Sequence, residues 1–164
     1  MLCIGDELLA GDTVNGNAAF LGTRARALGM PLVRVVTVRD RVDEIVEAAR
    51  AAAARCDVLF TSGGLGPTTD DLTTAALAAA AGVPLVRDEA ALARLAEKFR
   101  RFARSMPEAN HKQADFPQGA DVLANPIGTA EGFAMQLGRA GARTCRVFVM
   151  PGVPRELRRM TIDE

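Results

Sequence analysis

The stretch that decides the fold lies at residues 57–71 and reads DVLFTSGGLGPTTDD. It begins as a short apolar strand, and an Ala-rich helix is predicted directly after it, over residues 72–81. The turn between them contains Gly63, Gly64 and Gly66. Glycine lets a backbone turn sharply and approach a ligand, and free N–H groups at a helix N-terminus attract anions, so this junction predicts a phosphate cradle. The alternative is a purely structural turn, because the junction lacks the P-loop sequence and the glycine spacing of dinucleotide folds.

Apolar segments bounded by Gly or Pro alternate with helical patterns, which is typical of βαβ units around a parallel sheet. The last three predicted strands are short and close together, and the final two are joined by the hairpin residues 138–141. This pattern indicates an antiparallel edge. We therefore expect one α/β domain over residues 1–164, with a mainly parallel sheet and an antiparallel edge. The predicted strands are 2–5, 32–38, 57–61, 121–123, 133–137 and 145–150; the predicted helices are 15–28, 43–55, 72–81, 88–104 and 154–160, with a polar loop after the first strand.

The composition favours a small-molecule ligand. The chain has 20 basic and 20 acidic residues, with no run of Lys and Arg interleaved with aromatics, so neither a nucleic acid nor a membrane is an expected partner. No signal peptide or long apolar span is visible, so we expect the chain in the cytoplasm. Cys3, Cys56 and Cys145 are far apart in sequence and are expected to be reduced, buried thiols. Residues 1–4 read as a strand already under way, so we expect the native chain to begin upstream.

Acidic side chains accompany the cradle. Asp70 and Asp71 follow it directly, and two carboxylates beside phosphate oxygens are best tolerated when a divalent cation lies between them. Asp70 is explained equally well as a helix cap. Asp6 and Glu7 follow the first strand, and the carboxyl ends of parallel strands meet at one edge of the sheet. We therefore expect catalytic roles for Asp71, Asp6 and Glu7, and a metal held by Asp71, Asp70 and Asp6.

Other polar segments could complete such a site. Asn15 and Asn17 begin a predicted helix, where they are either caps or neutral donors to a ligand. Lys112 is a possible phosphate contact. The Gly- and Pro-rich segments 125–132 and 150–154 are either structural turns or loops that close over the crevice.

Six motifs occur in order over nearly the whole chain. They are IGDELL at 4–9 with Gly11, then Asn17, the run 62–73, Asn110 with Lys112 and Gln113, Asn125 with 128–130, and PGVP at 151–154. Together they closely resemble the N-terminal domain of the CinA (competence/damage-inducible) proteins, within the molybdopterin-binding superfamily that includes MoaB and MogA. The resemblance implies a three-layer α/β/α fold and a homo-oligomer.

The resemblance also implies an activity. In the CinA branch the domain resembles a metal-dependent ADP-ribose pyrophosphatase, with Mg²⁺, Mn²⁺ or Co²⁺ as the cation, whereas in the MogA branch a similar site adenylylates molybdopterin. The adenylyltransferases carry Thr where this chain has Leu65 and Arg where it has Asp70, which favours the CinA branch. A module that binds a nucleotide or pterin without turnover is a further alternative. The amidase domain of many CinA proteins lies outside these residues, so deamidation is not expected of them.

The matched motifs assign the ligand contacts. Glu131 stands where the family more often has Pro, so the shape of the loop around it is expected to differ. The residues expected to contact phosphate or nucleotide are Gly63, Gly64, Leu65, Gly66, Thr68, Asn17, Lys112, Gly128, Thr129, Pro151 and Gly152.

Overall fold

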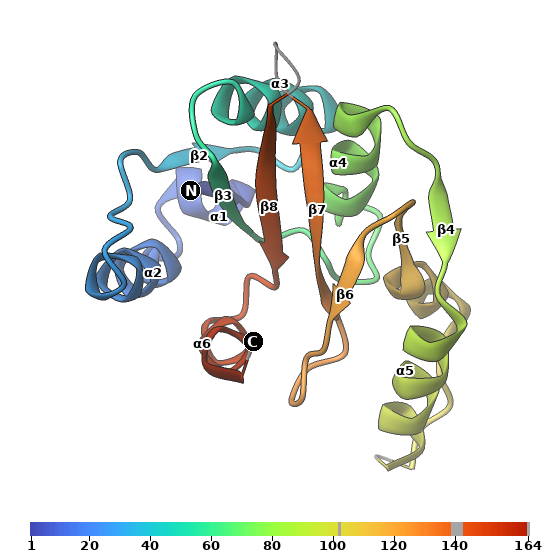
Figure 1. The fold of residues 1–164 in the computed structure, drawn as a ribbon. Helices are drawn as coiled ribbons and strands as arrows, with labels where there is room; N and C mark the ends of the chain where they lie inside the picture. The colour runs from blue at the N-terminus through green and yellow to red at the C-terminus, as the bar shows by residue number, and fades with distance from the viewer. Residues whose placement is uncertain (102, 139–142, 164) are drawn as a thin grey trace.

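A computed structural model of the protein describes residues 1–101, 103–138 and 143–163. Its centre is a six-stranded sheet with the order β2-β1-β3-β8-β7-β6 (Figure 1). The first four strands in this order pair in parallel, and β7 and β6 complete the sheet with antiparallel pairs. This arrangement confirms the predicted mainly parallel sheet with an antiparallel edge. The strands are β2 (Val36–Val38), β1 (Leu2–Ile4), β3 (Val58–Ser62), β8 (Thr144–Met150), β7 (Gly132–Gly138) and β6 (Asp121–Leu123).

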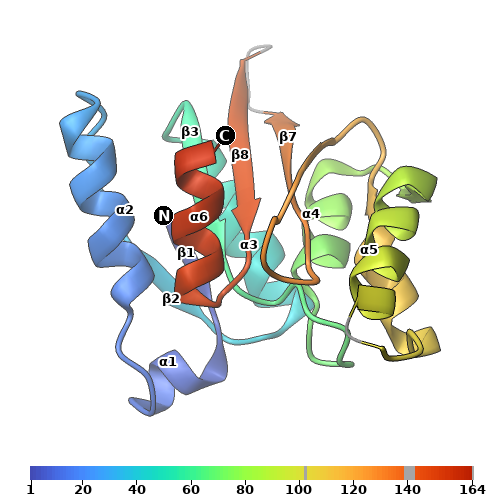
Figure 2. The same cartoon turned by 90° about the horizontal axis from the view of Figure 1, so that it is seen from below.

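Helices cover both faces of the sheet. On one face α3 (Val42–Ala53) packs against α4 (Thr73–Ala81), and on the other α2 (Gly16–Ala27) lies beside α6 (Pro154–Asp163) (Figure 2). The three-layer α/β/α fold is therefore confirmed. No helix in the described part of the chain is both long and apolar enough to span a membrane.

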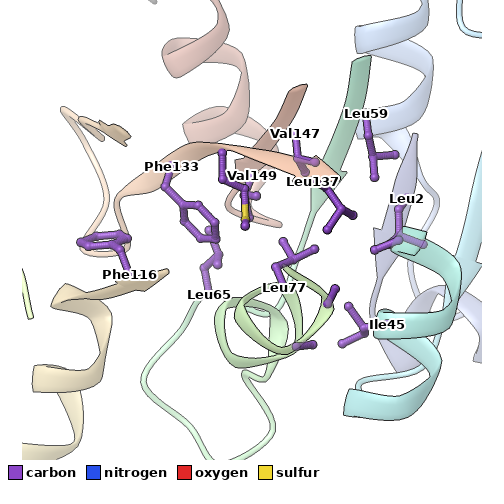
Figure 3. Packing of buried hydrophobic residues seen from close by; sticks show 14 of the residues in the cluster. Leu2, Ile45, Leu59, Leu65, Leu77, Phe116, Phe133, Leu137, Val147 and Val149 are labelled. Carbon is purple, nitrogen blue, oxygen red and sulfur yellow. The ribbon is translucent and has the colours of Figure 1, made fainter. Parts of the chain in front are cut away.

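The core fills the space between the sheet and the pair α3 and α4 (Figure 3). Leu2, Leu59 and Val147 point from adjacent strands toward Ile45 and Leu77, and each of these side chains is at most 1% exposed. Burying one such side chain fully contributes about 1.5–3 kcal/mol to folding. The alanines of both helices are small enough to let them approach the sheet closely, so aliphatic residues build this core without Trp or Tyr.

A lateral extension stands beside the antiparallel edge (Figure 1). It consists of β4 (Leu85–Arg87) paired antiparallel with β5 (Asp115–Pro117), the helix α5 (Glu89–Arg101), and the 3₁₀ helix η1 (Glu108–Ala114). Of these, only α5 was predicted from the sequence. The missed strands have three residues each, and proline stands within β5 (Pro117) and directly before β4 (Pro84), which argues against a strand in so short a segment.

Several other sequence predictions were wrong in detail. The expected polar loop after β1 contains a five-residue helix, α1 (Asp6–Ala10), which ends at Gly11 in a left-handed conformation with φ 83°. The strand predicted at 32–38 begins only at Val36. The helix predicted at 15–28 ends at Ala27, and Leu28 is its C-cap residue and is 69% exposed. The predicted hairpin turn at 138–141 lies mostly outside the described residues.

Candidate functional site

The glycine turn follows β3 and crosses the carboxyl ends of two neighbouring strands. Gly63 has φ 113°, and a Cβ at this position would lie 2.0 Å from the backbone oxygen of Ile4 in β1. Gly64 has φ 67°, and its Cβ would lie 2.2 Å from the hydroxyl of Thr73. That hydroxyl donates a hydrogen bond to the Gly63 carbonyl at 2.9 Å. Both positions therefore require glycine, because a side chain would collide with groups that fix the turn.

A cavity of about 480 Å³ opens beside this turn. It lies where the carboxyl ends of β1, β3 and β8 meet, which is where ligands bind in open α/β sheets. Its walls come from segments spread over the whole chain. The lining residues are Ile4, Gly5, Glu7, Asp40, Gly63, Gly64, Leu65, Gly66, Asp70, Asp71, Gln113, Thr129, Ala130, Pro151, Gly152, Val153 and Glu156.

Most of the predicted contact residues line this cavity, but five do not. The structure brings together the glycine turn, Glu7, Asp70, Asp71, Thr129, Pro151 and Gly152. Residues expected at the site but absent from the cavity wall are Asp6, Asn17, Thr68, Lys112 and Gly128. Four of these five residues form hydrogen bonds with residues that do line the cavity: Asp6, Asn17, Thr68 and Lys112.

Asp40 is a cavity residue that the sequence analysis missed. It follows β2, and its carboxylate Oδ2 accepts a hydrogen bond from the backbone N–H of Asp6 at 3.1 Å. Burial raises the pKa of Asp40, and the nearby charges of Asp6, Glu7 and Asp71 raise it further, against the lowering effect of that hydrogen bond. The strand-end argument that selected Asp6 applies equally to Asp40, so the sequence did contain the signal.

The Asp71 side chain forms hydrogen bonds within the segment that follows the glycine turn. Its Oδ2 accepts hydrogen bonds from the backbone N–H of Thr68 at 2.8 Å and from the Thr68 hydroxyl at 2.6 Å. Lys112 donates to the backbone carbonyl of Asp71 at 3.0 Å and also to that of Thr68. A Cβ at Gly66 would lie 2.5 Å from Asp71 Oδ2. Thr68 and Lys112 therefore fix the shape of the turn around Asp71.

Asp70 lines the cavity and does not cap α4. The residue at the N-cap position is Leu72, and no side chain makes a capping hydrogen bond there. The helix-cap explanation of Asp70 is therefore wrong, and its carboxylate is available to the cavity.

Asn17 joins three parts of the site. Its amide nitrogen donates to the hydroxyl of Ser62 at 2.8 Å and to the backbone carbonyl of Gly152 at 2.8 Å. The side chain is buried, so these bonds tie α2 to the ends of β3 and β8. Asn15 caps α2 by accepting from the N–H of Ala18 at 3.1 Å, as one of the two sequence interpretations predicted.

The loop after β6 is organised by Asn125, whose side chain is 1% exposed. Its amide nitrogen donates to the carbonyl of Ala130 and to Glu156 Oε2, both at 2.8 Å, and its oxygen accepts from the N–H of Gly128 at 2.8 Å. A Cβ at Gly128 would lie 2.1 Å from Glu156 Oε2. Gly128 thus leaves room for Glu156, a second cavity carboxylate that the sequence analysis missed.

Glu131 connects this loop to α5. Its carboxylate is 3% exposed and accepts two hydrogen bonds from the guanidinium of Arg94, at 2.8 and 2.7 Å. Lys98 lies 3.9 Å from the same carboxylate and donates to the carbonyl of Asn125 at 2.6 Å. Burial lowers the pKa of Lys98, although the charge of Glu131 opposes this effect. The residue that departs from the family pattern is therefore held in a bidentate ion pair.

The carboxylates of the described residues around the cavity do not form a preformed metal-binding site. Within residues 1–101, 103–138 and 143–163, no group of three or more His, Cys, Asp or Glu side chains is arranged to hold a metal ion. A cation at this site would need oxygen ligands from a bound molecule, which is the usual way in which proteins bind Mg²⁺ with a phosphate.

Comparisons with known proteins agree on the family. The sequence profile described as a probable molybdopterin binding domain matches residues 1–163. A CinA-like protein from Frankia casuarinae is 46% identical over 98% of this chain, and the chain spans 37% of that protein's length. The crystal structure of CinA from Thermoplasma acidophilum is 35% identical, with a TM-score of 0.86 over 99% of this chain and 92% of that one. A structure of MogA, 21% identical over 97% of this chain and 86% of that one, shares the fold with a TM-score of 0.59.

Proposed function

Because this chain belongs to the family of probable molybdopterin-binding domains, and within it to the CinA type, we propose that its cavity binds a phosphate-bearing nucleotide or pterin together with a divalent metal ion. We further propose that the domain hydrolyses the pyrophosphate of ADP-ribose or a similar compound. Mg²⁺, Mn²⁺ or Co²⁺ would serve as the cation, since carboxylates and phosphates supply the oxygen ligands that these ions take.

The charge of the cavity is the observation that carries this proposal. Five carboxylates line it, those of Glu7, Asp40, Asp70, Asp71 and Glu156, and none of the described residues in its wall is basic. Two like charges 4 Å apart near a protein surface repel by about 4 kcal/mol. Each hydrogen bond from a backbone N–H to a charged phosphate contributes only about 1.5–3 kcal/mol. The hydrogen bonds of the glycine turn alone would therefore not outweigh the repulsion between a pyrophosphate and these carboxylates. A divalent cation between them would replace this repulsion with attraction.

The chain's own residues have distinct roles in this proposal. The N–H groups of Gly64 and Gly66 hold the phosphate oxygens, while Asp70 and Asp71 hold the cation beside the turn. The N–H of Gly63 donates to the Met150 carbonyl at 3.2 Å and fixes the turn. Glu7 lies in the same wall and could supply a further oxygen. When bound, the cation would neutralise phosphate charge and so favour attack at phosphorus. Asp6 does not line the cavity and would act on the site through its bond to Asp40.

Asp40 is the residue best suited to act as a general base. Its raised pKa brings it closer to neutrality, where a carboxylate accepts protons more effectively. In the proposed reaction water attacks one phosphorus atom of ADP-ribose and the bridging P–O bond breaks. AMP and ribose 5-phosphate leave, and Asp40 takes the proton of the attacking water. Glu156, beside Gly128, could accept a hydrogen bond from a hydroxyl or amino group of the ligand.

A binding module without turnover is the second candidate. The bonds from Thr68 to Asp71 Oδ2 give this carboxylate a structural task that needs no metal. The same pocket could then recognise a nucleotide or pterin and present it to another protein. An adenylyltransferase would require ATP as a second substrate, and Leu65 and Asp70 depart from the pattern of those enzymes.

One assay separates these candidates. We expect the protein to release AMP from ADP-ribose with Mg²⁺, Mn²⁺ or Co²⁺ and not in EDTA, with Asp40→Asn and Asp71→Asn lowering the rate about 100-fold or more. Asp43→Asn, an exposed residue of α3 that is not among the residues lining the cavity, is the matched control and should keep the wild-type rate. Metal-independent AMP release, or equal rates in all variants, would refute the proposed metal-dependent site. Binding of ADP-ribose without any AMP would instead support the binding module.

A further inference from the structure

Two thiols that are far apart in the sequence lie close together at the end of the sheet opposite the cavity, where β3 and β8 begin. Cys56 and Cys145 are separated by 89 positions, yet their sulfur atoms are 3.8 Å apart. Cys56 follows α3 and precedes β3, and Cys145 is the second residue of β8. These two strands pair in parallel and lie side by side (Figure 1).

The backbone holds the two cysteines in this position. The N–H of Arg146 donates to the carbonyl of Asp57 at 2.8 Å, so the residues directly after the two cysteines are hydrogen-bonded. The N–H of Cys56 donates to the Ala52 carbonyl at 3.1 Å, and the Cys56 thiol donates to the same carbonyl at 3.1 Å. The proximity of the thiols thus follows from the strand register and from the end of α3.

The two sulfur atoms lie within van der Waals contact of each other. A disulfide needs a separation of about 2.0 Å, so about 1.8 Å must be closed. Cys145 is fully buried, whereas Cys56 is partly exposed and can meet a reagent from solvent. Cys3, the remaining cysteine, is buried in β1.

We propose that Cys56 and Cys145 form a reversible disulfide when the protein meets a low-molecular-weight disulfide such as oxidised glutathione. The Cys56 thiolate attacks one sulfur of the small disulfide and expels one small thiol. The Cys145 thiolate then attacks the Cys56 sulfur in the mixed disulfide and expels the second small thiol. The protein loses two electrons and two protons, and the small disulfide is reduced to two thiols.

The disulfide would be a redox-dependent cross-link at one end of the sheet. It would join the beginnings of β3 and β8, whose other ends carry the glycine turn and the loop at Pro151. The seven residues of β8 place the two ends about 20 Å apart. We therefore expect the bond to stabilise the fold without altering the ligand cavity. Closing a loop of this length should raise Tm by about 10 °C.

The test treats the folded, reduced protein with oxidised glutathione under native conditions. We expect a mass lower by two hydrogen atoms, one remaining thiol that maps to Cys3, and linked peptides containing Cys56 and Cys145. Tm should rise, and dithiothreitol should reverse the change. Cys56→Ser should abolish the shift in mass and in Tm, whereas Cys3→Ala, the control at the third thiol, keeps a small apolar side chain at its buried position and should retain both.

The result that would overturn the proposal is a folded wild-type protein that keeps three thiols after this treatment, or that carries glutathione on Cys56 without a linked peptide. A shift that persists in Cys56→Ser would contradict it equally. Cys56→Ser is preferred to Cys145→Ser, because the latter alters a fully buried thiol and could unfold the protein for that reason alone.

Discussion

Replacing Gly63 by Ala tests whether the glycine turn lies against β1 as the structure describes. Its φ of 113° costs an L-residue about 1–3 kcal/mol. The new Cβ would lie 2.0 Å from the Ile4 backbone oxygen, so a buried strand must shift, which costs about another 1–3 kcal/mol. We expect a loss of about 4 kcal/mol, a large part of the roughly 5–15 kcal/mol by which domains are stable.

Gly119→Ala is the matched control, because it separates strain from collision. Gly119 has φ 81°, and a Cβ at this position would have no neighbouring atom within 4 Å, so only about 1–2 kcal/mol of strain is expected. Urea unfolding followed by far-UV circular dichroism gives both free energies. If Gly63→Ala is destabilised by no more than Gly119→Ala, the close approach of the turn to β1 is wrong, and with it the wall of the cavity.

Three further predictions concern the charged groups around the cavity. Arg94→Ala leaves Glu131 buried without its bidentate partner and should destabilise the fold by about 2 kcal/mol in urea unfolding, whereas Glu131→Gln should cost less because the Arg94 side chain that loses its partner is 45% exposed and remains solvated. Lys112→Met removes the donor to the carbonyls of Thr68 and Asp71 and should cost about 1.5 kcal/mol by the same measurement; an unchanged free energy would contradict its role in fixing the turn. The folded state raises the pKa of Asp40, so its proton stabilises the fold at low pH and this contribution is lost as pH rises through the folded pKa. Asp40→Asn should therefore be more stable than the wild type at neutral pH, with the difference shrinking as pH falls, and a difference that grows in acid would refute this sign.

The sequence predicted the central sheet because its strands are marked by apolar residues and bounded by glycine or proline. The turn at 62–66 was recognisable because glycines follow an apolar strand and precede a helix. The short elements α1, β4 and β5 contain too few residues to show a period, and β4 and β5, unlike the equally short β6 that was predicted, also have a proline within or directly before them.

The candidate site was predictable only where a residue stands next to a recognisable strand end. Asp6 and Glu7 were selected because they follow β1, and Asp70 and Asp71 because they follow the glycine turn; all of these except Asp6 line the cavity. Asp40 obeys the same rule, two residues after the predicted and observed end of β2 at Val38, but was not selected. Glu156 reaches the cavity through its bond with Asn125, a contact between residues 31 positions apart that no local pattern encodes.

The roles of supporting residues also depend on tertiary contacts. Lys112 was expected to contact phosphate because a lysine near a phosphate site is the natural partner for an anion. In the structure its ammonium donates to two backbone carbonyls of the turn, and the contact with phosphate stays a prediction. Glu131 was expected to change the loop, but its partner Arg94 lies in α5, 37 positions away. Such pairings become visible only when the elements are placed in space.

The most direct test of the central claim, that the acidic cavity binds a phosphate ligand only together with a divalent cation, is calorimetric titration of the protein with a non-hydrolysable analogue of ADP-ribose in EDTA and in Mn²⁺. We predict binding in Mn²⁺ and none in EDTA, because five carboxylates without a basic residue in the described wall repel the pyrophosphate. Equal affinity in the two conditions would contradict the claim.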